Sequence, residues 1–359
     1  MIGLPDGAPD TPFLAVDIDV MERNLTRTAT SAAERGLALR PHAKTHKVLE
    51  IGRRQLELGA VGLTVATVGE AEVFAMGGFD DLFLAYPVWA TPSRSARLRA
   101  VAERATLTLG VDSVEGIEEL AGGLSGSGVR LMIEIDSGHH RSGVQPNDAG
   151  ALAAAAERAG LALAGVFTFP GQGYALDGRA KAAREEAEAI ERAAASIERL
   201  GIDVVVRSGG STPTLADADS SVLTEIRPGV YVFNDAQQTE LGSCTFADVA
   251  LTARATVVSR SGPNAIIDAG SKVLGADQPG WVTGGGRLPD YPDARIVALS
   301  EHHATVRFPS EAPPPPRGTV VRVAPNHVCS AVNLADELIV VQNETVIDSW
   351  TVAARGANN

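Results

Sequence analysis

The chain has 359 residues, of which 45% are hydrophobic, and it carries a formal net charge of −13 at pH 7. This length and composition predict a large hydrophobic core and more than one domain. The negative charge argues against a nucleic-acid surface or an anionic membrane as the partner, so we expect any phosphate group to be bound in a local basic pocket.

The sequence contains no sign of export or membrane insertion. Its beginning has no basic segment followed by an apolar stretch, and the longest apolar stretches, such as residues 149–156, are too short to span a membrane. Cys244 and Cys329 are the only cysteines and provide no disulfide framework. We therefore expect a cytoplasmic protein that binds neither membrane nor nucleic acid.

From about Phe13 to about Val232, short apolar runs alternate with alanine-, glutamate- and arginine-rich segments of helical period. This alternation predicts repeated βα units. The predicted strands are 13–16, 37–40, 63–66, 82–85, 107–111, 131–135, 163–168, 204–207 and 230–233. Roughly eight units favour a closed (β/α)8 barrel over a doubly wound open sheet, which typically repeats five or six times.

After about Gly242 the pattern changes to strands without intervening helices. The predicted strands are 249–259, 265–268, 296–299, 304–308, 319–323, 338–342 and 344–352. The predicted fold class is therefore α/β, with a (β/α)8 barrel over residues 13–242 and a smaller all-β domain over residues 243–359. We expect residues 1–12 to join the β domain.

Lys44 is a candidate reactive amine. It lies in the segment 40–47 (RPHAKTHK), directly after an apolar run at the end of a predicted strand. A lysine forms a Schiff base with a carbonyl group when burial and nearby positive charge lower its pKa. The alternative is a basic loop with solvated side chains, which is the interpretation we give to Arg40 and Lys47.

The segment 207–214 (RSGGSTPT) is a candidate phosphate site. Glycines let backbone amides converge, and serine and threonine hydroxyls add donors. A plain βα turn is the alternative, although barrel enzymes often bind phosphate after their late strands. Tyr231 follows in a predicted apolar strand, as a core residue or as a donor to a phosphate oxygen.

His327 and Cys329 form a candidate metal site in the β domain. On an extended backbone, residues two apart face the same side and could bind one metal ion together. Imidazole and thiolate favour zinc over magnesium or calcium. Two protein ligands would leave positions open for water or substrate, as in a catalytic site.

Together these segments resemble the D-threonine aldolase and D-serine dehydratase family. The resemblance extends over nearly the whole chain and rests on five segments in the family's order: 42–46 (HAKTH), 137–143 (SGHHRSG), 209–214 (GGSTPT), 227–231 (RPGVY) and 327–329 (HVC). That family is similar to alanine racemase in fold, with an α/β barrel that carries pyridoxal phosphate and a β domain that brings the metal ion. The resemblance also implies a homodimer.

The resemblance implies a role for each candidate residue. Lys44 would form the Schiff base with pyridoxal phosphate, and His327 and Cys329 would match the metal ligands, with zinc expected and manganese or magnesium as alternatives. The remaining cofactor-binding candidates are Arg141 near the ring, Tyr174 beside the cofactor, Tyr231, and Gly210, Ser211 and Thr212 at the phosphate. The dehydratase branch typically has His-x-Cys at the metal, whereas the aldolase branch more often has His-x-Asp.

One position departs from the family. Where the family commonly has a histidine, the segment 169–174 (FPGQGY) has Gln172, whose carboxamide cannot transfer a proton at neutral pH. If that histidine performs acid–base chemistry in relatives, another group or a metal-bound water must replace it here. His302 is our catalytic candidate, with His303 beside it, and a surface histidine pair is the alternative.

The resemblance implies a lyase that acts on β-hydroxy-D-amino acids, a small-molecule substrate class. D-threonine aldolase-type cleavage and D-serine dehydratase-type elimination both remain open. A racemase would need a second acid–base group, usually a tyrosine from the β domain, and only Tyr291 follows Tyr231. A non-catalytic pyridoxal phosphate carrier would need only the barrel.

Overall fold

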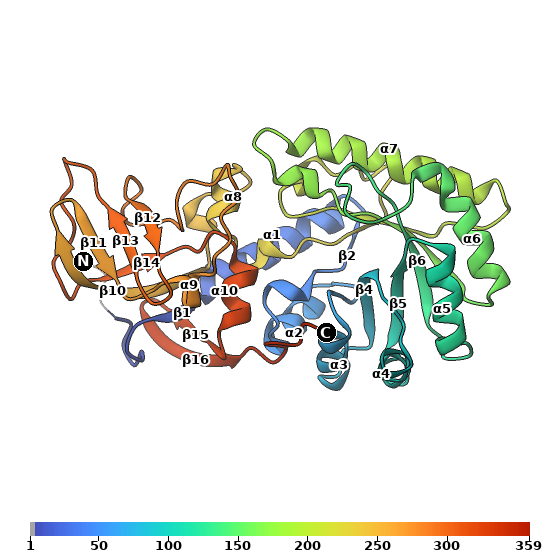
Figure 1. The fold of residues 1–359 in the computed structure, drawn as a ribbon, viewed down its shortest axis with the longest axis horizontal. Helices are drawn as coiled ribbons and strands as arrows, with labels where there is room; N and C mark the ends of the chain where they lie inside the picture. The colour runs from blue at the N-terminus through green and yellow to red at the C-terminus, as the bar shows by residue number, and fades with distance from the viewer. Residues whose placement is uncertain (1–3) are drawn as a thin grey trace. The chain divides into compact units, whose positions relative to one another are not determined.

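The computed structural model describes residues 4–359, which form two compact units (Figure 1). The barrel unit consists of Thr28–Lys44, Ile51–Gly229 and Ala357–Asn359. The β unit consists of the chain up to Arg27, Thr45–Glu50 and Val230–Gly356. No helix among these described residues is long and apolar enough to cross a membrane.

The barrel unit contains eight parallel strands in the order β2-β9-β8-β7-β6-β5-β4-β3. The two end strands are linked: Val61 N donates to Leu39 O (2.9 Å), Thr64 N donates to Pro41 O (2.8 Å), and His42 pairs with Thr64. The predicted (β/α)8 barrel is therefore confirmed. The strands are β2 Ala38–Leu39, β3 Leu63–Val65, β4 Asp81–Pro87, β5 Thr106–Val111, β6 Arg130–Glu134, β7 Ala162–Phe167, β8 Val206–Gly209 and β9 Glu225–Ile226.

Helices follow the barrel strands, and each helix from α3 to α7 packs on the next (Figure 1). Polar residues start several of them: the Thr67 hydroxyl accepts from Glu70 N, and the Ser113 hydroxyl accepts from Gly116 N. The helices are α1 Ile18–Glu34, which runs from the β unit into the barrel unit, α2 Leu49–Glu57, α3 Val68–Met76, α4 Pro92–Ala102, α5 Val114–Leu124, α6 Ala149–Arg158 and α7 Arg179–Glu198.

Large apolar side chains fill the barrel. Phe83, Met132 and Phe167 form a buried cluster in which the rings of Phe83 and Phe167 meet edge to face at 4.9 Å. Gly165 on β7 allows a close strand approach, because a Cβ atom there would lie 1.9 Å from Val206 O.

The β unit contains a mixed sheet in the order β12-β13-β11-β10-β1-β15-β16, with β14 paired to β10. Its strands are β1 Phe13–Asp17, β10 Leu251–Ser261, β11 Asn264–Ile267, β12 Arg295–Leu299, β13 Ala304–Arg307, β14 Val320–Val323, β15 Glu337–Gln342 and β16 Thr345–Thr351. Three short helices, α8 Ala236–Glu240, α9 Ser271–Leu274 and α10 Val328–Leu334, accompany the strands.

Two predicted barrel strands are wrong. The run 13–16 does form a strand, β1, but it pairs with β10 and β15 in the β unit. The run 230–233 forms a 3₁₀ turn, Val230–Val232, instead of a strand. Both are short apolar runs, whose hydrophobicity alone does not identify their partners or their conformation.

The predicted domain ranges, 13–242 for the cofactor-binding barrel and 243–359 for the metal-carrying β domain, stay a prediction. The prediction that residues 1–12 join the β domain includes residues 1–3, which lie outside the described residues. Within the described part, Asp6 forms an isolated bridge with Thr345 in the β unit.

Candidate active site

Lys44 lies in a 3₁₀ turn, Ala43–Thr45, which follows β2. Its side chain is half-buried, and its Nζ atom lies 5.7 Å from the centroid of the Phe169 ring. The Arg141 guanidinium carbon lies 5.3 Å from the same centroid. Phe169 therefore has two cationic side chains close to one aromatic ring.

The predicted cofactor residues of the barrel unit, together with Phe169, follow strands of the same parallel sheet. Lys44 follows β2, Arg141 follows β6, Phe169 and Tyr174 follow β7, and the glycine turn at 210–212 follows β8. Because these strands are parallel, their carboxyl ends meet at one edge of the barrel, where barrel enzymes carry their active sites. The Phe169 and Tyr174 ring centroids are 6.2 Å apart.

Hydrogen bonds fix the backbone of the glycine turn, residues 210–212. Gly210 has φ of 75°, a left-handed conformation that suits glycine, and its amide donates to Glu186 Oε1 at 2.7 Å. The Ser211 amide donates to Thr214 Oγ1 at 3.0 Å, and both Ser211 and Thr212 are buried. Since the Gly210 amide is committed to Glu186, a phosphate would rely on the other donors of this turn.

Glu186 places a buried carboxyl group beneath the glycine turn. Its Oε2 atom has no hydrogen-bond partner among the described residues. Burial raises the pKa of Glu186 to about 7, although the Gly210 amide and the positive charge of Arg227 oppose this rise. The Glu186 carboxyl therefore titrates close to neutral pH.

The raised pKa of Glu186 predicts a fall in stability with pH. Between about pH 4.5 and 7 the folded protein holds a proton that the unfolded chain has lost, so the free energy of unfolding falls as pH rises. Glu186→Gln keeps the acceptor for Gly210 and removes the titration. Between pH 5 and pH 8, the free energy of unfolding should therefore fall by up to about 3 kcal/mol more in the wild type than in Glu186→Gln. Urea unfolding at the two pH values measures both changes. Glu188→Gln, exposed on the same helix, is the control, and an unchanged pH dependence in Glu186→Gln would refute the assignment.

Arg227 is a buried cation inside the barrel. Its guanidinium carbon lies 5.5 and 5.3 Å from the ring centroids of Phe83 and Phe167, and it donates to Thr168 O at 2.6 Å and to the Ser208 hydroxyl. Sequence reasoning gave Arg227 no role, although it lies in one of the family segments. It supplies fixed positive charge near β8, which precedes the glycine turn.

Two basic residues near Lys44 are not solvated, contrary to prediction. Arg40 forms ion pairs with Glu225 and Asp81, each at 2.7 Å. Lys47 is buried, and its Nζ donates to Asn333 Oδ1 at 2.7 Å. Burial of a charged side chain requires such partners, and those partners lie far away in sequence.

The Gln172 side chain connects three segments of the barrel unit by hydrogen bonds. Its Nε2 atom donates to Ser137 O at 2.8 Å and to Glu185 Oε2 at 3.3 Å. The carboxamide thus joins the 3₁₀ turn Gly171–Tyr174 to the loop after β6 and to α7.

His327 and Cys329 lie at the start of α10, so the extended backbone on which their pairing was predicted ends at His327. His327 is the N-cap residue and retains an extended backbone, whereas Cys329 is the second helical residue. Their side chains nevertheless interact. Burial lowers the pKa of His327, but Cys329 and the hydrogen bond to Asp277 outweigh it and raise the pKa to about 11.

Asp277 orients the imidazole ring of His327. Its Oδ2 atom lies 2.5 Å from His327 Nδ1 and accepts a hydrogen bond from the Ser330 hydroxyl at 2.8 Å. A carboxylate on one ring nitrogen leaves the other nitrogen for a metal ion. Nothing in the local sequence around Asp277, 50 residues earlier, signals this contact.

The surroundings of Cys329 hold the helix start in place. Asp235 Oδ2 accepts from Val328 N at 3.1 Å, and the Thr45 hydroxyl lies 3.2 Å from Cys329 Sγ. In the part of the chain that the structure describes, no three His, Cys, Asp or Glu side chains are grouped to hold a metal ion. His327 and Cys329 would therefore supply two protein ligands.

Two further predicted residues lie elsewhere in the β unit. His302, like His303, is exposed in the turn between β12 and β13, where Glu301 pairs with Lys272 at 2.7 Å. Tyr231 is buried in the turn Val230–Val232. The roles predicted for His302 and Tyr231 stay predictions.

Comparison with known proteins supports the family suggested by the motifs. Residues 16–237 match the family model for the alanine racemase N-terminal domain, and residues 250–341 match a putative serine dehydratase domain. A D-threo-3-hydroxyaspartate dehydratase from Delftia sp. is 35% identical, covering 89% of this chain and 91% of its own. A D-threonine aldolase from Arthrobacter sp. is 33% identical, covering 99% and 95%. The chain belongs to the D-threonine aldolase and D-serine dehydratase family.

Solved structures of this family have the same fold. The D-threonine aldolase from Filomicrobium marinum has a TM-score of 0.90 and 32% identity, covering 99% of this chain and 98% of its own. A cysteine-to-alanine variant of the D-threo-3-hydroxyaspartate dehydratase, in a metal-free form, has a TM-score of 0.88 and 30% identity, covering 96% and 97%. The present chain is an enzyme of the lyase type, and the family supports pyridoxal phosphate as its cofactor and a small amino acid as its substrate.

Proposed function

We propose that this enzyme is a pyridoxal phosphate- and metal-dependent lyase that acts on β-hydroxy-D-amino acids. The observation that carries the proposal is the arrangement of Lys44, Arg141 and the glycine turn 210–212 at the carboxyl ends of three strands, β2, β6 and β8, of one barrel. The relatives named above, a dehydratase and an aldolase, give the substrate class.

The barrel residues fit the cofactor. When bound, pyridoxal phosphate supplies an electron sink for negative charge that develops at the substrate Cα. The Lys44 amine would hold the cofactor and would take up or return a proton at the substrate Cα. Arg141 contributes positive charge beside Phe169, and the Phe169 and Tyr174 rings provide an apolar surface that excludes water.

The β-unit residues fit a divalent metal ion, which we propose to be zinc. When bound, such an ion supplies a Lewis acid for the β-hydroxyl group. Asp277 orients His327, and Cys329 presents a sulfur ligand next to it. The metal-free structure of a cysteine variant of the Delftia dehydratase supports a metal ion in this family.

Acidifying the β-hydroxyl group would assist aldol cleavage, and stabilising it as a leaving group would assist elimination. The metal ion therefore does not decide between the two reactions. His-x-Cys at the metal position favours elimination, because the resemblance associates it with the dehydratase branch. The family resemblance also leads us to propose an acid–base role for His302 and a homodimer. A phosphate contact of Tyr231 is proposed because a buried phenol needs a hydrogen-bond partner. A cytoplasmic location is proposed because the two cysteines provide no disulfide framework.

Product analysis tests this proposal. We expect D-serine, D-threonine or D-threo-3-hydroxyaspartate to be consumed at least about a hundredfold faster than its L-enantiomer, because stereochemistry determines which substituents the site can reach. Equal amounts of ammonia and keto acid would identify elimination, and equal amounts of glycine and aldehyde would identify aldol cleavage. Interconversion of D- and L-alanine would instead identify a racemase. Failure with every amino acid would favour a carrier protein.

A further inference from the structure

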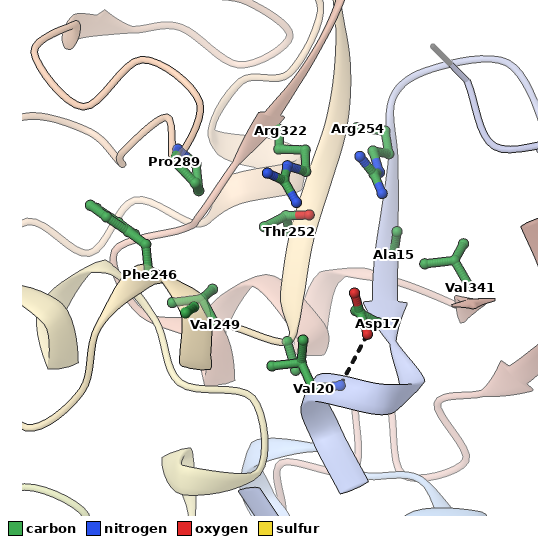
Figure 2. A pocket seen from close by; sticks show the side chains of 12 residues that line it. Ala15, Asp17, Val20, Phe246, Val249, Thr252, Arg254, Pro289, Arg322 and Val341 are labelled. Carbon is green, nitrogen blue, oxygen red and sulfur yellow. Dashed lines mark hydrogen bonds between the residues drawn. The ribbon is translucent and has the colours of Figure 1, made fainter. Parts of the chain in front are cut away.

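A cavity of about 270 Å³ lies in the β unit, and none of its lining residues belongs to the proposed cofactor or metal site (Figure 2). One face of four neighbouring strands, β14, β10, β1 and β15, forms its floor. Strand pairing places Arg322 opposite Arg254 and Val341 opposite Asp17. Phe246 and Pro289 are among the residues that line the rest of the cavity.

The two arginines form an unusual cross-strand pair. Like charges directly opposite one another destabilise a sheet. Arg322 is neutralised by Asp290, to which it donates through Nε at 2.9 Å and through Nη2. Among the described residues, Arg254 has one ion pair, with Glu344 at 3.2 Å.

Arg254 is a buried cation with unused hydrogen-bonding capacity. Its side chain is only 3% exposed, and its Nε and Nη1 atoms have no hydrogen-bond partner among residues 4–359. Burial lowers the pKa of Arg254, and the charge of Arg322 lowers it further. A buried guanidinium left partly unsatisfied is costly, and an anionic ligand would relieve that cost.

Asp17 determines which anion suits the cavity. One of its carboxylate oxygens accepts from Val20 N at 3.0 Å, and Figure 2 shows the other directed towards the side on which Arg254 and Arg322 lie. A phosphate dianion would be repelled by this carboxylate, whereas an ammonium group would be attracted by it. The volume is just below the range of about 300–1,000 Å³ typical of drug-sized ligands, so a small ligand fits.

We propose that this cavity binds a small zwitterionic amino acid, with its carboxylate at Arg254 and its ammonium group at Asp17. The site lies within the β unit and does not depend on the chemistry proposed for Lys44. Apolar side chains, including Phe246, Val249 and Val341, would contact the carbon skeleton of the ligand.

A pair of isosteric probes tests the proposal by calorimetry on the full chain with its cofactor. N,N-dimethylglycine is a zwitterion whose tertiary ammonium group cannot form a Schiff base with pyridoxal phosphate. 3-Methylbutanoate has the same shape and the carboxylate but no positive charge. We expect one N,N-dimethylglycine to bind per chain, at least about tenfold more tightly than 3-methylbutanoate.

Variants identify the two ends of the site. Arg254→Gln is expected to lower the affinity for both probes by at least about tenfold, whereas Asp17→Asn should lower the affinity for N,N-dimethylglycine only. Asparagine remains a good N-cap for α1, so Asp17→Asn carries the test even if Arg254→Gln does not fold. Arg260→Gln, exposed on the same strand β10, is the matched control and should bind like the wild type.

Three outcomes would overturn the proposal. The wild type could bind neither probe. Asp17→Asn could leave N,N-dimethylglycine binding unchanged. The wild type could bind both probes with equal affinity, and Arg254→Gln could bind neither. The cavity would then be an adventitious anion site only.

Discussion

Lys44→Ala is expected to abolish the visible absorbance of bound pyridoxal phosphate and to lower activity by roughly a thousandfold or more. Lys44 is the lysine whose amine lies beside Phe169, at the edge of the barrel where Arg141 and the glycine turn also lie. Absorbance spectra of the purified variant, reconstituted with excess cofactor, measure the first effect. Assays on the D-amino acid that the wild type consumes measure the second.

Lys181→Ala is the control for Lys44→Ala. Lys181 is exposed on α7 of the same unit and pairs with Glu185 at 3.5 Å. It should retain the absorbance and the activity of the wild type. A wild-type spectrum in a folded Lys44→Ala protein would refute the assignment of Lys44, whatever the reaction catalysed.

Exhaustive chelation is expected to reduce activity by at least about a hundredfold while the cofactor absorbance remains. Zinc should restore the activity of the wild type. Cys329→Ala and His327→Ala should lower the bound metal from one ion per chain to a small fraction, as measured by elemental analysis. These variants lose a ligand directly, whereas Lys44 is unchanged in both.

Cys244→Ala is the matched control for Cys329→Ala. Burial raises the pKa of the Cys244 thiol to about 12, so the thiol stays protonated and is a poor metal ligand. This variant should bind metal as the wild type does. Full activity after complete metal removal, or an unchanged metal content in Cys329→Ala, would exclude the proposed metal site.

The barrel and the β domain could both be predicted from the sequence, because the change from alternating segments to continuous strands is a local pattern. The family could be predicted because its motifs are short and occur in the expected order. The sheet to which Phe13–Asp17 belongs could not be predicted, since its partners β10 and β15 lie more than 230 residues away. An apolar run of four residues fits the barrel equally well.

The site was predicted less completely than the fold. Lys44, Arg141 and the turn 210–212 lie directly in recognisable motifs, so their common position at one barrel edge follows from parallel strands. Asp277 and Glu186 act through contacts with residues distant in sequence, His327 and Gly210, and no local pattern announces such contacts.

The helix at Cys329 shows a related limit. Valine and small residues in 328–332 fit a strand or a helix, and the outcome depends on Asp235, which accepts from the Val328 amide at the helix start. That carboxylate lies 93 residues earlier in the chain. Local propensity alone therefore could not decide the conformation of the proposed metal-binding pair.

The facing arginines of the β unit also have an evolutionary consequence. Each buried polar group without a hydrogen-bond partner costs a protein about 1–3 kcal/mol of folding free energy, and Glu344, the ion-pair partner of Arg254, is exposed enough to be solvated without it. Selection for heat resistance alone would therefore remove the guanidinium at position 254. Keeping it would require a benefit that a melting curve of the ligand-free protein does not record, and directed evolution for robustness alone would be free to discard the proposed ligand site along with the charge.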